Sequence, residues 1–348
     1  MENLPDSKCC PSDHQKPWYQ NKTFLVAFIL VLLIGISYGW PLLVPFRQAL
    51  FMYIYIVWWA ILLGLFVGGA IEHFVPRQYV TQILAHPGKR SIVHAVLYGF
   101  LMSVCCHGVL ALAIQLHKKG AATSSVVAFL LASPWANLPL SIILIGFFGL
   151  VKAFYIIMSA VIIAITTGLI FQILEAKEWV EINQKAAEFD EDFSIKDDFV
   201  KRFRNYSLTI QQVREDIKGV FKGAISLSDM VLWWILIGIG LASLAGAYIP
   251  TEIFQKYMGP SVGGMLVTLL AATIMEVCSE GTAPLAFEVF RQTGALGNAL
   301  VFLMAGVATD YTEIGLLWHN VGRKTAIWLP LVAVPQIILF GIIANLIF

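Results

Sequence analysis

Long apolar runs constrain this chain more than any other feature of its sequence. The six longest runs are Thr23–Tyr38, Phe51–Ala70, Val126–Leu150, Ala153–Leu174, Met230–Ala247 and Ile327–Phe348. A helix needs about 20 mostly apolar residues to cross the hydrocarbon core of a bilayer. Charged residues make up only 13% of the chain, about half the share of a soluble domain. The sequence therefore predicts an all-α integral membrane protein and excludes a soluble globular domain.

Breaks between the apolar stretches divide the chain into about nine expected transmembrane helices. Their approximate ranges are Thr23–Val44, Tyr53–Val75, Ser91–Leu116, Thr123–Phe148, Ala153–Leu174, Ser228–Tyr248, Val262–Phe290, Leu296–Trp318 and Thr325–Ile347. The predicted organisation is a polar N-terminal tail (1–22), a first transmembrane helix (23–45), one transmembrane repeat (50–174), a charged soluble linker (175–225) and a second repeat (226–348). The tail has no cleavage pattern, so we expect the first apolar run to remain as an anchor.

An internal duplication is indicated by a match between the two halves. Ser103–Gly108 aligns with Glu276–Gly281, and at the same offset Asn137 falls on Asp310. Two-fold repeats are a common construction of transporters. Four complete spans in each half would make the repeats parallel. Re-entrant hairpins at the third and seventh apolar segments would change the span count, so the orientation of the repeats stays open.

The positions of Lys and Arg indicate the membrane orientation only weakly. If all nine segments cross the membrane, Arg47, Lys118, Lys119 and Arg291 fall on the side of the central linker. The opposite side then has Arg77, Lys89, Arg90, Arg323 and Lys324. Because cytoplasmic loops carry an excess of these residues, this distribution gives the linker no clear side, and we lean towards a cytoplasmic one. The net charge of +1 gives no indication of a nucleic-acid partner.

Four interruptions of apolar segments lie in register in the two halves. Cys105–Gly108 corresponds to Cys278–Gly281, and Ser133–Pro139 corresponds to Gly306–Thr312. Backbone that leaves the helix at mid-membrane is tolerated only beside protein or a water-filled cavity. A single interruption would be read as an ordinary kink, but matched interruptions are typical of a substrate site. We therefore expect broken or re-entrant helices at mid-membrane, with substrate contacts that include Asn137, Gly108 and Gly281.

Three cysteines, Cys105, Cys106 and Cys278, lie at two of these interruptions. Thiolates are soft ligands for soft metals and metalloids. Cys105 and Cys278 occupy equivalent places in the two halves, so they could face each other across the pseudo-symmetry axis. The alternative is that each cysteine is a small, buried apolar side chain. We predict that these three residues bind the substrate, as ligands of a metal or metalloid.

Ionisable residues within apolar segments indicate a path for protons. Such groups are costly in a membrane, by about 3 kcal/mol or more, and usually mark ion or proton pathways. The residues predicted to take part in proton coupling are Glu276, Glu280, Asp310 and His107. Glu288 lies near the end of a predicted span, where we expect it to be solvated.

Together these motifs resemble the ArsP-type predicted permease family of bacteria. The resemblance rests on Val104–Gly108, Lys119–Ala121, Ala128–Pro139, Val277–Pro284 and Phe302–Asp310, and it covers roughly Tyr53 to the C-terminus. It implies a multi-pass efflux permease of the plasma membrane, here the bacterial inner membrane. Some relatives are associated with trivalent organoarsenicals, and others with copper and zinc. Cysteines at these interruptions match the family's proposed thiol-binding positions.

The predicted function is secondary, proton-coupled efflux of a thiophilic metal or metalloid species such as a trivalent organoarsenical. A copper- or zinc-type efflux permease is the first alternative. A membrane thiol oxidoreductase using Cys105 and Cys106, or a membrane scaffold without transport, are alternatives of other classes. We expect no enzymatic activity and no cofactor. The expected partners are the lipid bilayer and the substrate, with no nucleic acid, and the oligomeric state is left open.

Overall fold

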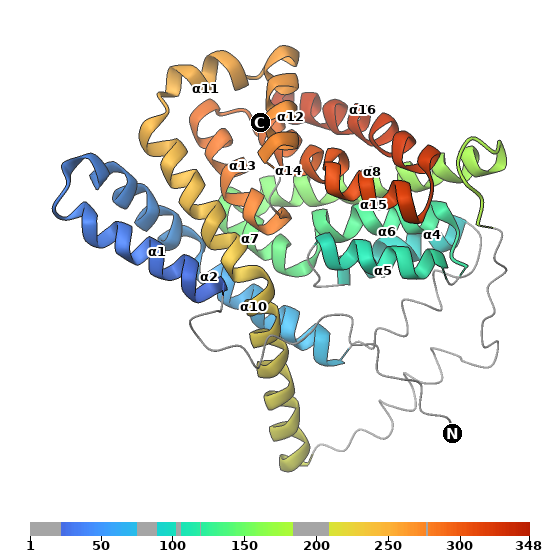
Figure 1. Cartoon of the computed structure of the whole chain (residues 1–348), viewed down its shortest axis with the longest axis horizontal. Helices are drawn as coiled ribbons and strands as arrows, with labels where there is room; N and C mark the ends of the chain where they lie inside the picture. The colour runs from blue at the N-terminus through green and yellow to red at the C-terminus, as the bar shows by residue number, and fades with distance from the viewer. Residues whose placement is uncertain (1–21, 75–88, 102–105, 119, 184–208, 276–277) are drawn as a thin grey trace.

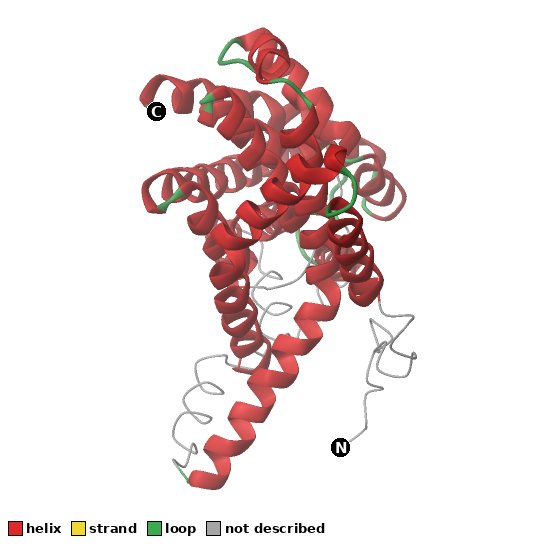
Figure 2. Cartoon of the chain, turned by 90° about the vertical axis from the view of Figure 1, so that its left-hand side faces the viewer, coloured by secondary structure: helices red, strands yellow, loops and turns green. Residues whose placement is uncertain are grey.

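The chain folds into a bundle of helices, seen in a computed structural model that describes residues 22–74, 89–101, 106–118, 120–183, 209–275 and 278–348 (Figure 1). Within those ranges the structure contains no β-strand, as the uniformly red ribbon and green loops of Figure 2 show. The helices are α1 (Lys22–Ser37), η3 (Pro41–Leu43), α2 (Val44–Phe74), α4 (Lys89–Leu101), α5 (Cys106–Lys118), α6 (Thr123–Ala136), α7 (Leu138–Phe148), α8 (Leu150–Ala176), α10 (Ile210–Tyr248), α11 (Thr251–Met258), α12 (Val262–Met275), α13 (Ser279–Thr293), α14 (Leu296–Thr309), α15 (Tyr311–Asn320) and α16 (Arg323–Ile347). The all-α prediction is thus confirmed.

Five helical stretches of the described chain are long and apolar enough to cross a membrane, and two bent pairs could raise the number to seven. Large apolar side chains such as Trp58, Leu62 and Phe154 are exposed on the outside of the bundle. Apolar exposure of this extent is expected where lipid surrounds the helices and is unfavourable in water. The chain is a multi-pass membrane protein, but the predicted count of nine spans is not confirmed.

Contacts between helix ends define two opposite ends of the bundle. At the linker end, where α8 finishes and α10 begins, His73 Nε2 of α2 lies 3.0 Å from Asp216 Oδ1 of α10. At the far end, the Tyr248 hydroxyl, at the end of α10, donates to the Leu42 carbonyl just before α2. The helices α2 and α10 therefore run antiparallel along the whole bundle.

Helices α12 and α13 form a hairpin that enters from the far end and returns to it. The Asn298 amide at the start of α14 donates to the Gly259 carbonyl just before α12. The hydroxyls of Thr273 and Thr309, near the ends of α12 and α14, are 2.6 Å apart. α12 therefore runs beside α14 into the bundle, and α13 must lead back, because it ends only three residues before α14 begins.

Helices α4 and α5 make the corresponding hairpin from the linker end. Ser125 Oγ at the start of α6 donates to Ser91 Oγ at the start of α4 at 3.0 Å. Gly99, near the end of α4, lies against the last turn of α6. His117 at the end of α5 returns to within 3.3 Å of Thr123, where α6 begins. Each of the third and seventh predicted spans is therefore not one continuous helix but contains two short helices that run in opposite directions.

The two hairpins change the sides to which the basic residues belong. Lys118, at the end of α5, and Arg323, at the start of α16, both lie at the linker end. Arg47, at the start of α2, and Arg291, near the end of α13, lie at the far end. The distribution inferred from nine crossing spans was wrong for Arg47, Arg291, Arg90, Arg323 and Lys324, which each change sides. The linker end of the described chain is the more basic one.

Helix boundaries recur along the chain at a fixed spacing. Five helices of the first half each begin 173 residues before a helix of the second half. The first five, α4 to α8, begin at residues 89, 106, 123, 138 and 150, and their counterparts begin at 262, 279, 296, 311 and 323. Among the described residues, the four glycines with positive φ form two pairs at nearly the same spacing, Gly120 with Gly294 and Gly149 with Gly322. Only glycine adopts such angles readily, so the recurrent turns follow from recurrent glycines.

A short segment after α8 ties the two halves together at the linker end. The Glu181 carboxylate accepts the backbone N–H groups of Lys324 and Thr325, both at 2.9 Å, and so caps the start of α16. Although burial raises the pKa of Glu181, these backbone hydrogen bonds and one from the Thr325 hydroxyl lower it more, so the pKa lies below its ordinary value of 4.5. The Asn183 amide of the same segment donates to the Ala121 carbonyl at 3.0 Å. One segment thus holds the α5–α6 turn and α16 together.

Candidate functional site

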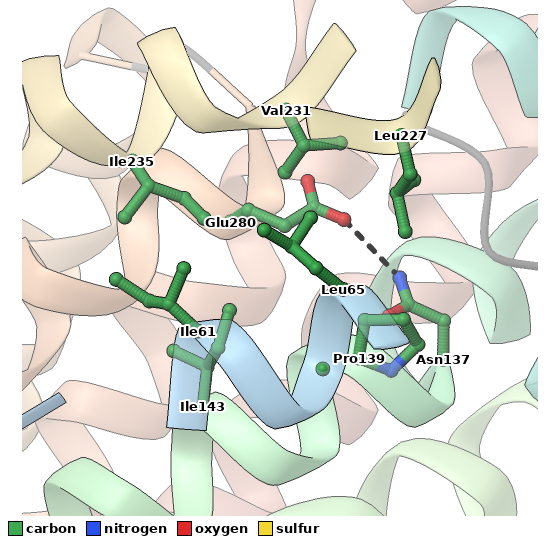
Figure 3. A pocket seen from close by; sticks show the side chains of 10 residues that line it. Ile61, Leu65, Asn137, Pro139, Ile143, Leu227, Val231, Ile235 and Glu280 are labelled. Carbon is green, nitrogen blue, oxygen red and sulfur yellow. Dashed lines mark hydrogen bonds between the residues drawn. The ribbon is translucent and has the colours of Figure 1, made fainter. Parts of the chain in front are cut away.

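The first turns of α7 and α13 meet inside the bundle at a contact between Asn137 and Glu280. Asn137 ends α6 and caps α7: its Oδ1 accepts the Leu140 N–H at 2.8 Å. Asparagine is a preferred N-cap residue, and Pro139 follows it in the first turn, where proline's missing N–H does no harm. The Asn137 Nδ2 donates to Glu280 Oε1 at 3.3 Å, as Figure 3 shows. The predicted interruption at Ser133–Pro139 is confirmed, with a bend of 41°.

Glu280 is 3% exposed, and donors surround its carboxylate. Its Oε2 accepts the Cys278 thiol at 2.8 Å and the Ser279 hydroxyl at 3.1 Å. It also lies in the first turn of α13, where the helix dipole favours a negative charge. The site thus presents a carboxylate and a thiol side by side, in a place that bulk water does not reach.

Glycine lets α10 approach this first turn of α13 closely. A Cβ on Gly238 of α10 would collide with the carbonyl oxygen of Gly281. A Cβ on Gly281 would in turn lie 2.8 Å from the Trp234 carbonyl oxygen. Gly281, predicted as a substrate contact, therefore holds backbone against backbone beside Glu280 and sets the position of that carboxylate.

A small cavity of about 10 Å³ adjoins the Asn137–Glu280 contact. It is lined by Ile61, Gly64, Leu65, Asn137, Pro139, Ile143, Leu227, Val231, Ile235 and Glu280 (Figure 3). About one water molecule needs this much space. The bundle is therefore closed around the site in this conformation, and a larger ligand requires the helices to separate.

An aromatic cluster closes the space between the site and the far end. The rings of Phe147 and Phe287, at the ends of α7 and α13, stack with centroids 5.1 Å apart. Tyr53 of α2 meets Phe287 edge to face at 6.1 Å, and Phe148 meets it at 5.5 Å. Because α7 and α13 touch near both ends, they run side by side in the same direction from the site to this cluster.

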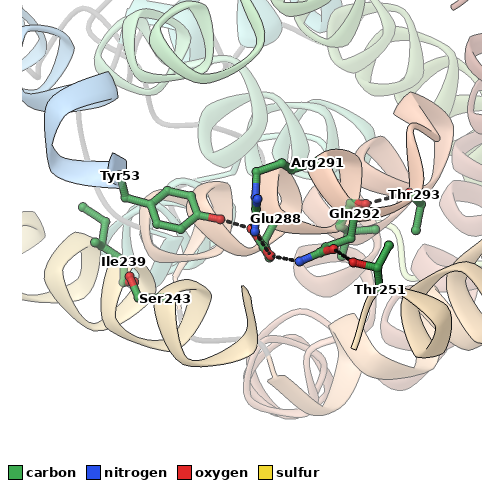
Figure 4. A network of polar contacts seen from close by, with 9 residues as sticks. Tyr53, Ile239, Ser243, Thr251, Glu288, Arg291, Gln292 and Thr293 are labelled. Carbon is green, nitrogen blue, oxygen red and sulfur yellow. Dashed lines mark hydrogen bonds and ion pairs between the residues drawn. The ribbon is translucent and has the colours of Figure 1, made fainter. Parts of the chain in front are cut away.

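Beyond the aromatic rings lies a buried polar network around Glu288 (Figure 4). Arg291 binds both carboxylate oxygens of Glu288 at 2.8 Å. Gln292 Nε2 donates to the same carboxylate at 2.6 Å, and the Tyr53 hydroxyl is a fourth donor. The expectation that Glu288 is solvated was wrong: it is 1% exposed, because α2 and the end of α13 enclose it.

Asp310 occupies the interruption between α14 and α15 and belongs to a separate cluster. Its carboxylate accepts the Thr312 N–H at 3.0 Å and also the Thr312 hydroxyl. It thus caps α15 as Asn137 caps α7, 173 residues earlier. Glu313 of the same turn is 2% exposed. The structure brings Glu280 together with Asn137 and Cys278, whereas the hydrogen bonds of Asp310 stay within its own turn.

Several predicted site residues lie outside the described part of the chain. Cys105 and Glu276 fall in the undescribed ranges, and for Cys106, His107 and Gly108 only the backbone in the first turn of α5 is described. Among the described residues, no group of three or more His, Cys, Asp or Glu side chains could hold a metal ion. Of the predicted thiol ligands, the structure therefore describes Cys278 alone, buried beside Glu280.

Sequence reasoning missed several residues of this region: Tyr53, Gly238, Ser279, Arg291 and Gln292. The spacing Glu288–Arg291 could have revealed the ion pair, since residues three apart face each other on a helix. No sequence signal pointed to Tyr53 or Gly238, because both meet α13 from helices that are distant in the chain.

Comparison with known proteins places the chain in a family. The sequence profile of a family of predicted permeases, ArsP_1, matches residues 46–346. The chain belongs to this permease family. A Bacillus subtilis protein named UPF0718 protein YcgR is 22% identical over 81% of this chain and 90% of its own length. No solved protein structure matches the chain.

Two further relatives also match most of this chain. A Streptococcus mutans protein, 21% identical over 74% of this chain and 80% of its own length, is named as a subunit of a two-component membrane permease complex. The UPF0718 protein MJ0584 of Methanocaldococcus jannaschii is 20% identical over 83% of this chain and 91% of its own length. Family and relatives together identify a membrane permease.

Proposed function

We propose that this permease is a secondary transporter that exports a thiophilic metalloid or metal species, and that the substrate binds where α7 meets α13. The single observation that carries the proposal is the buried contact of Glu280 with Cys278 and Asn137. Two interrupted elements from different halves meet there, as expected for a transporter's central site. A soft cationic centre would find a thiol ligand and a compensating carboxylate at this place.

The two halves of the bundle are proposed to be inverted repeats over 50–174 and 226–348. The recurrence of helix starts after 173 residues supports a duplication. One re-entrant hairpin and three crossing segments in each half would give an odd number of crossings, so the second repeat begins on the opposite side. The polar tail (1–22), the helix at 23–45 and the linker (175–225) then lie outside the duplication. Inverted repeats allow the two halves to exchange conformations and so to open a site alternately to each side.

The linker end is proposed to face the cytoplasm of a bacterial cell, with the chain in the inner membrane. Lys and Arg concentrate on the cytoplasmic side of membrane proteins. The described basic residues of the linker end include Arg90, Lys118, Lys177, Arg214, Lys218, Lys222, Arg323 and Lys324, against Arg47, Lys152, Lys256 and Arg291 at the far end. Export would then run from the linker end to the far end, past the aromatic cluster.

Proton exchange is proposed to drive the export. Glu280, which accepts hydrogen bonds from Cys278, Ser279 and Asn137, would release its proton when a cationic substrate binds and regain it afterwards. Asp310, Glu276 and His107 are further candidates for the proton path, and Cys105 and Cys106 are candidates for additional thiol ligands. The preferred substrates are trivalent organoarsenicals, and copper or zinc ions are the alternative.

The experiment is a resistance and efflux assay in a bacterial host that lacks its own metal and arsenical exporters. The panel contains trivalent arsenicals, antimonite, copper, zinc and a cation without affinity for thiols. Wild type is compared with Cys278→Ala and Glu280→Gln, and with Glu252→Gln, which changes an exposed acid in α11. We expect export of one soft species, lost in the first two variants and retained in the third. Export at the wild-type rate in Cys278→Ala would exclude the thiol site.

A further inference from the structure

The first part of α10 has two parallel stripes on its exposed face. Ile217, Phe221 and Ile225 are 53%, 49% and 54% exposed. Arg214, Lys218 and Lys222 follow the same four-residue spacing, and the two lysines come directly after Ile217 and Phe221. A basic stripe therefore lies beside the apolar one. Residues from both stripes line a shallow hollow of about 470 Å³. Figures 1 and 2 show this part of α10 projecting beyond the rest of the described bundle.

The helix places this hollow at the level of lipid headgroups. Tyr248 marks the far end of α10 through its bond to Leu42. Tyr248 is 26 positions after Lys222, which corresponds to about 39 Å at 1.5 Å per residue. A bilayer has a hydrocarbon core of about 30 Å and is about 40–45 Å thick with its headgroups. Lys222 therefore lies in the headgroup layer, and Lys218 lies one turn further out.

Contacts with α2 support this placement independently. Phe66 of α2 meets Phe221 edge to face at 5.2 Å, so this ring lies beside the last apolar turns of α2. His73, seven residues beyond Phe66 on α2, pairs with Asp216, five residues before Phe221 on α10, and this pair marks the change from apolar to polar side chains on both helices. The apolar stripe thus borders the hydrocarbon, and the basic stripe reaches the layer above it.

The two lysines have no partner within the described part of the protein. No hydrogen bond or ion pair joins Lys218 or Lys222 to another described residue. The acidic residues on α2 and this part of α10 are Glu72, Glu215, Asp216 and Asp229, of which Asp216 is engaged by His73. Basic residues near a membrane surface attract anionic lipid by about 1 kcal/mol each. Two such charges beside the apolar stripe match a molecule with an anionic head and a hydrocarbon tail.

We propose that this face of α10 binds an anionic phospholipid. Its phosphate lies against Lys218 and Lys222, and an acyl chain follows Phe221 and Ile225 towards the bilayer interior. A partner protein fits this surface less well, because charged residues are depleted from the centre of protein interfaces and both lysines would have to be desolvated. This inference is independent of the transported substrate.

The test measures retained lipid by native mass spectrometry on the full chain released from nanodiscs of phosphatidylglycerol or phosphatidylcholine. Lys218→Gln/Lys222→Gln removes both charges, and Ile225→Ser makes the apolar stripe more polar without changing charge. Lys152→Gln/Lys256→Gln at the far end is the matched control. We expect wild type to prefer phosphatidylglycerol, with affinity reduced about tenfold or more in the double variant and weakened in Ile225→Ser. The control should match wild type.

Three results would overturn the proposal. They are equal retention of the two lipids by wild type, unchanged phosphatidylglycerol binding in Lys218→Gln/Lys222→Gln, and equal losses in the far-end control. A protein that co-purifies with wild type and is lost in the double variant, with lipid retention unchanged, would assign the surface to a protein partner instead. The melting temperature of each variant in phosphatidylcholine nanodiscs shows that it is folded.

Discussion

Removal of Arg291 should destabilise the protein strongly, because it leaves the Glu288 carboxylate buried without a counter-charge. Glu288 is 1% exposed, whereas the Arg291 side chain is 37% exposed. Breaking a buried ion pair from one side costs about 3–5 kcal/mol. We expect Arg291→Met to fall near the lower limit, about 3 kcal/mol, because Tyr53 and Gln292 still donate to the carboxylate.

The reverse change should be milder, and the two changes should not add. In Glu288→Gln the half-exposed guanidinium can turn to water, so the loss is about 1–2 kcal/mol. The double variant has no unpaired buried charge, so its loss should be smaller than the sum by at least about 1 kcal/mol. Unfolding by denaturant in one detergent, followed by Trp fluorescence, measures all four proteins. Additive losses, or a loss below 1 kcal/mol for Arg291→Met, would refute the reasoning about this network.

Three further predictions follow from individual contacts. Glu181→Gln should remove the pH dependence of the α16 cap. In wild type, the contribution of Glu181 to stability is present above about pH 4.5 and is lost as pH falls through its lowered pKa. The melting temperatures at pH 3.5 and pH 7 should therefore differ less in the variant. Gly238→Ala should push α10 away from Gly281, and it should lower the melting temperature and abolish export, whereas Gly35→Ala, which meets open space, should do neither. Asn137→Ala removes an N-cap and a donor to Glu280, so it should cost about 1 kcal/mol in denaturant unfolding and reduce export. An Asn137→Ala protein with wild-type export would show that this contact has no part in transport.

The helix interruptions could be predicted from the sequence because their causes are local. Asn137 is a good N-cap, and Pro139 cannot donate an N–H, so a break between α6 and α7 follows from a few adjacent residues. The equivalent place of Asp310 was also visible, since it needs only the alignment of the two halves. Local chemistry of this kind does not depend on the rest of the fold.

The direction of the chain after an interruption could not be predicted. The apolar stretch over 262–290 is long enough to cross a bilayer, and nothing within it distinguishes a kinked span from a hairpin. The reversal is decided by tertiary contacts, such as Asn298 with the Gly259 carbonyl. The burial of Glu288 is of the same kind, because Tyr53 lies 235 residues away in the sequence.

The measurement that tests the central claim most directly is site-resolved alkylation of Cys278 in the wild-type permease. Membranes are treated with a permeant maleimide, with and without the exported species, and each cysteine is quantified by peptide mass spectrometry. If the substrate binds where Cys278 meets Glu280, it should slow the modification of Cys278 severalfold, whereas the cation without affinity for thiols should leave that rate unchanged. Unchanged modification of Cys278, at a substrate concentration that saturates export, would contradict the proposed site.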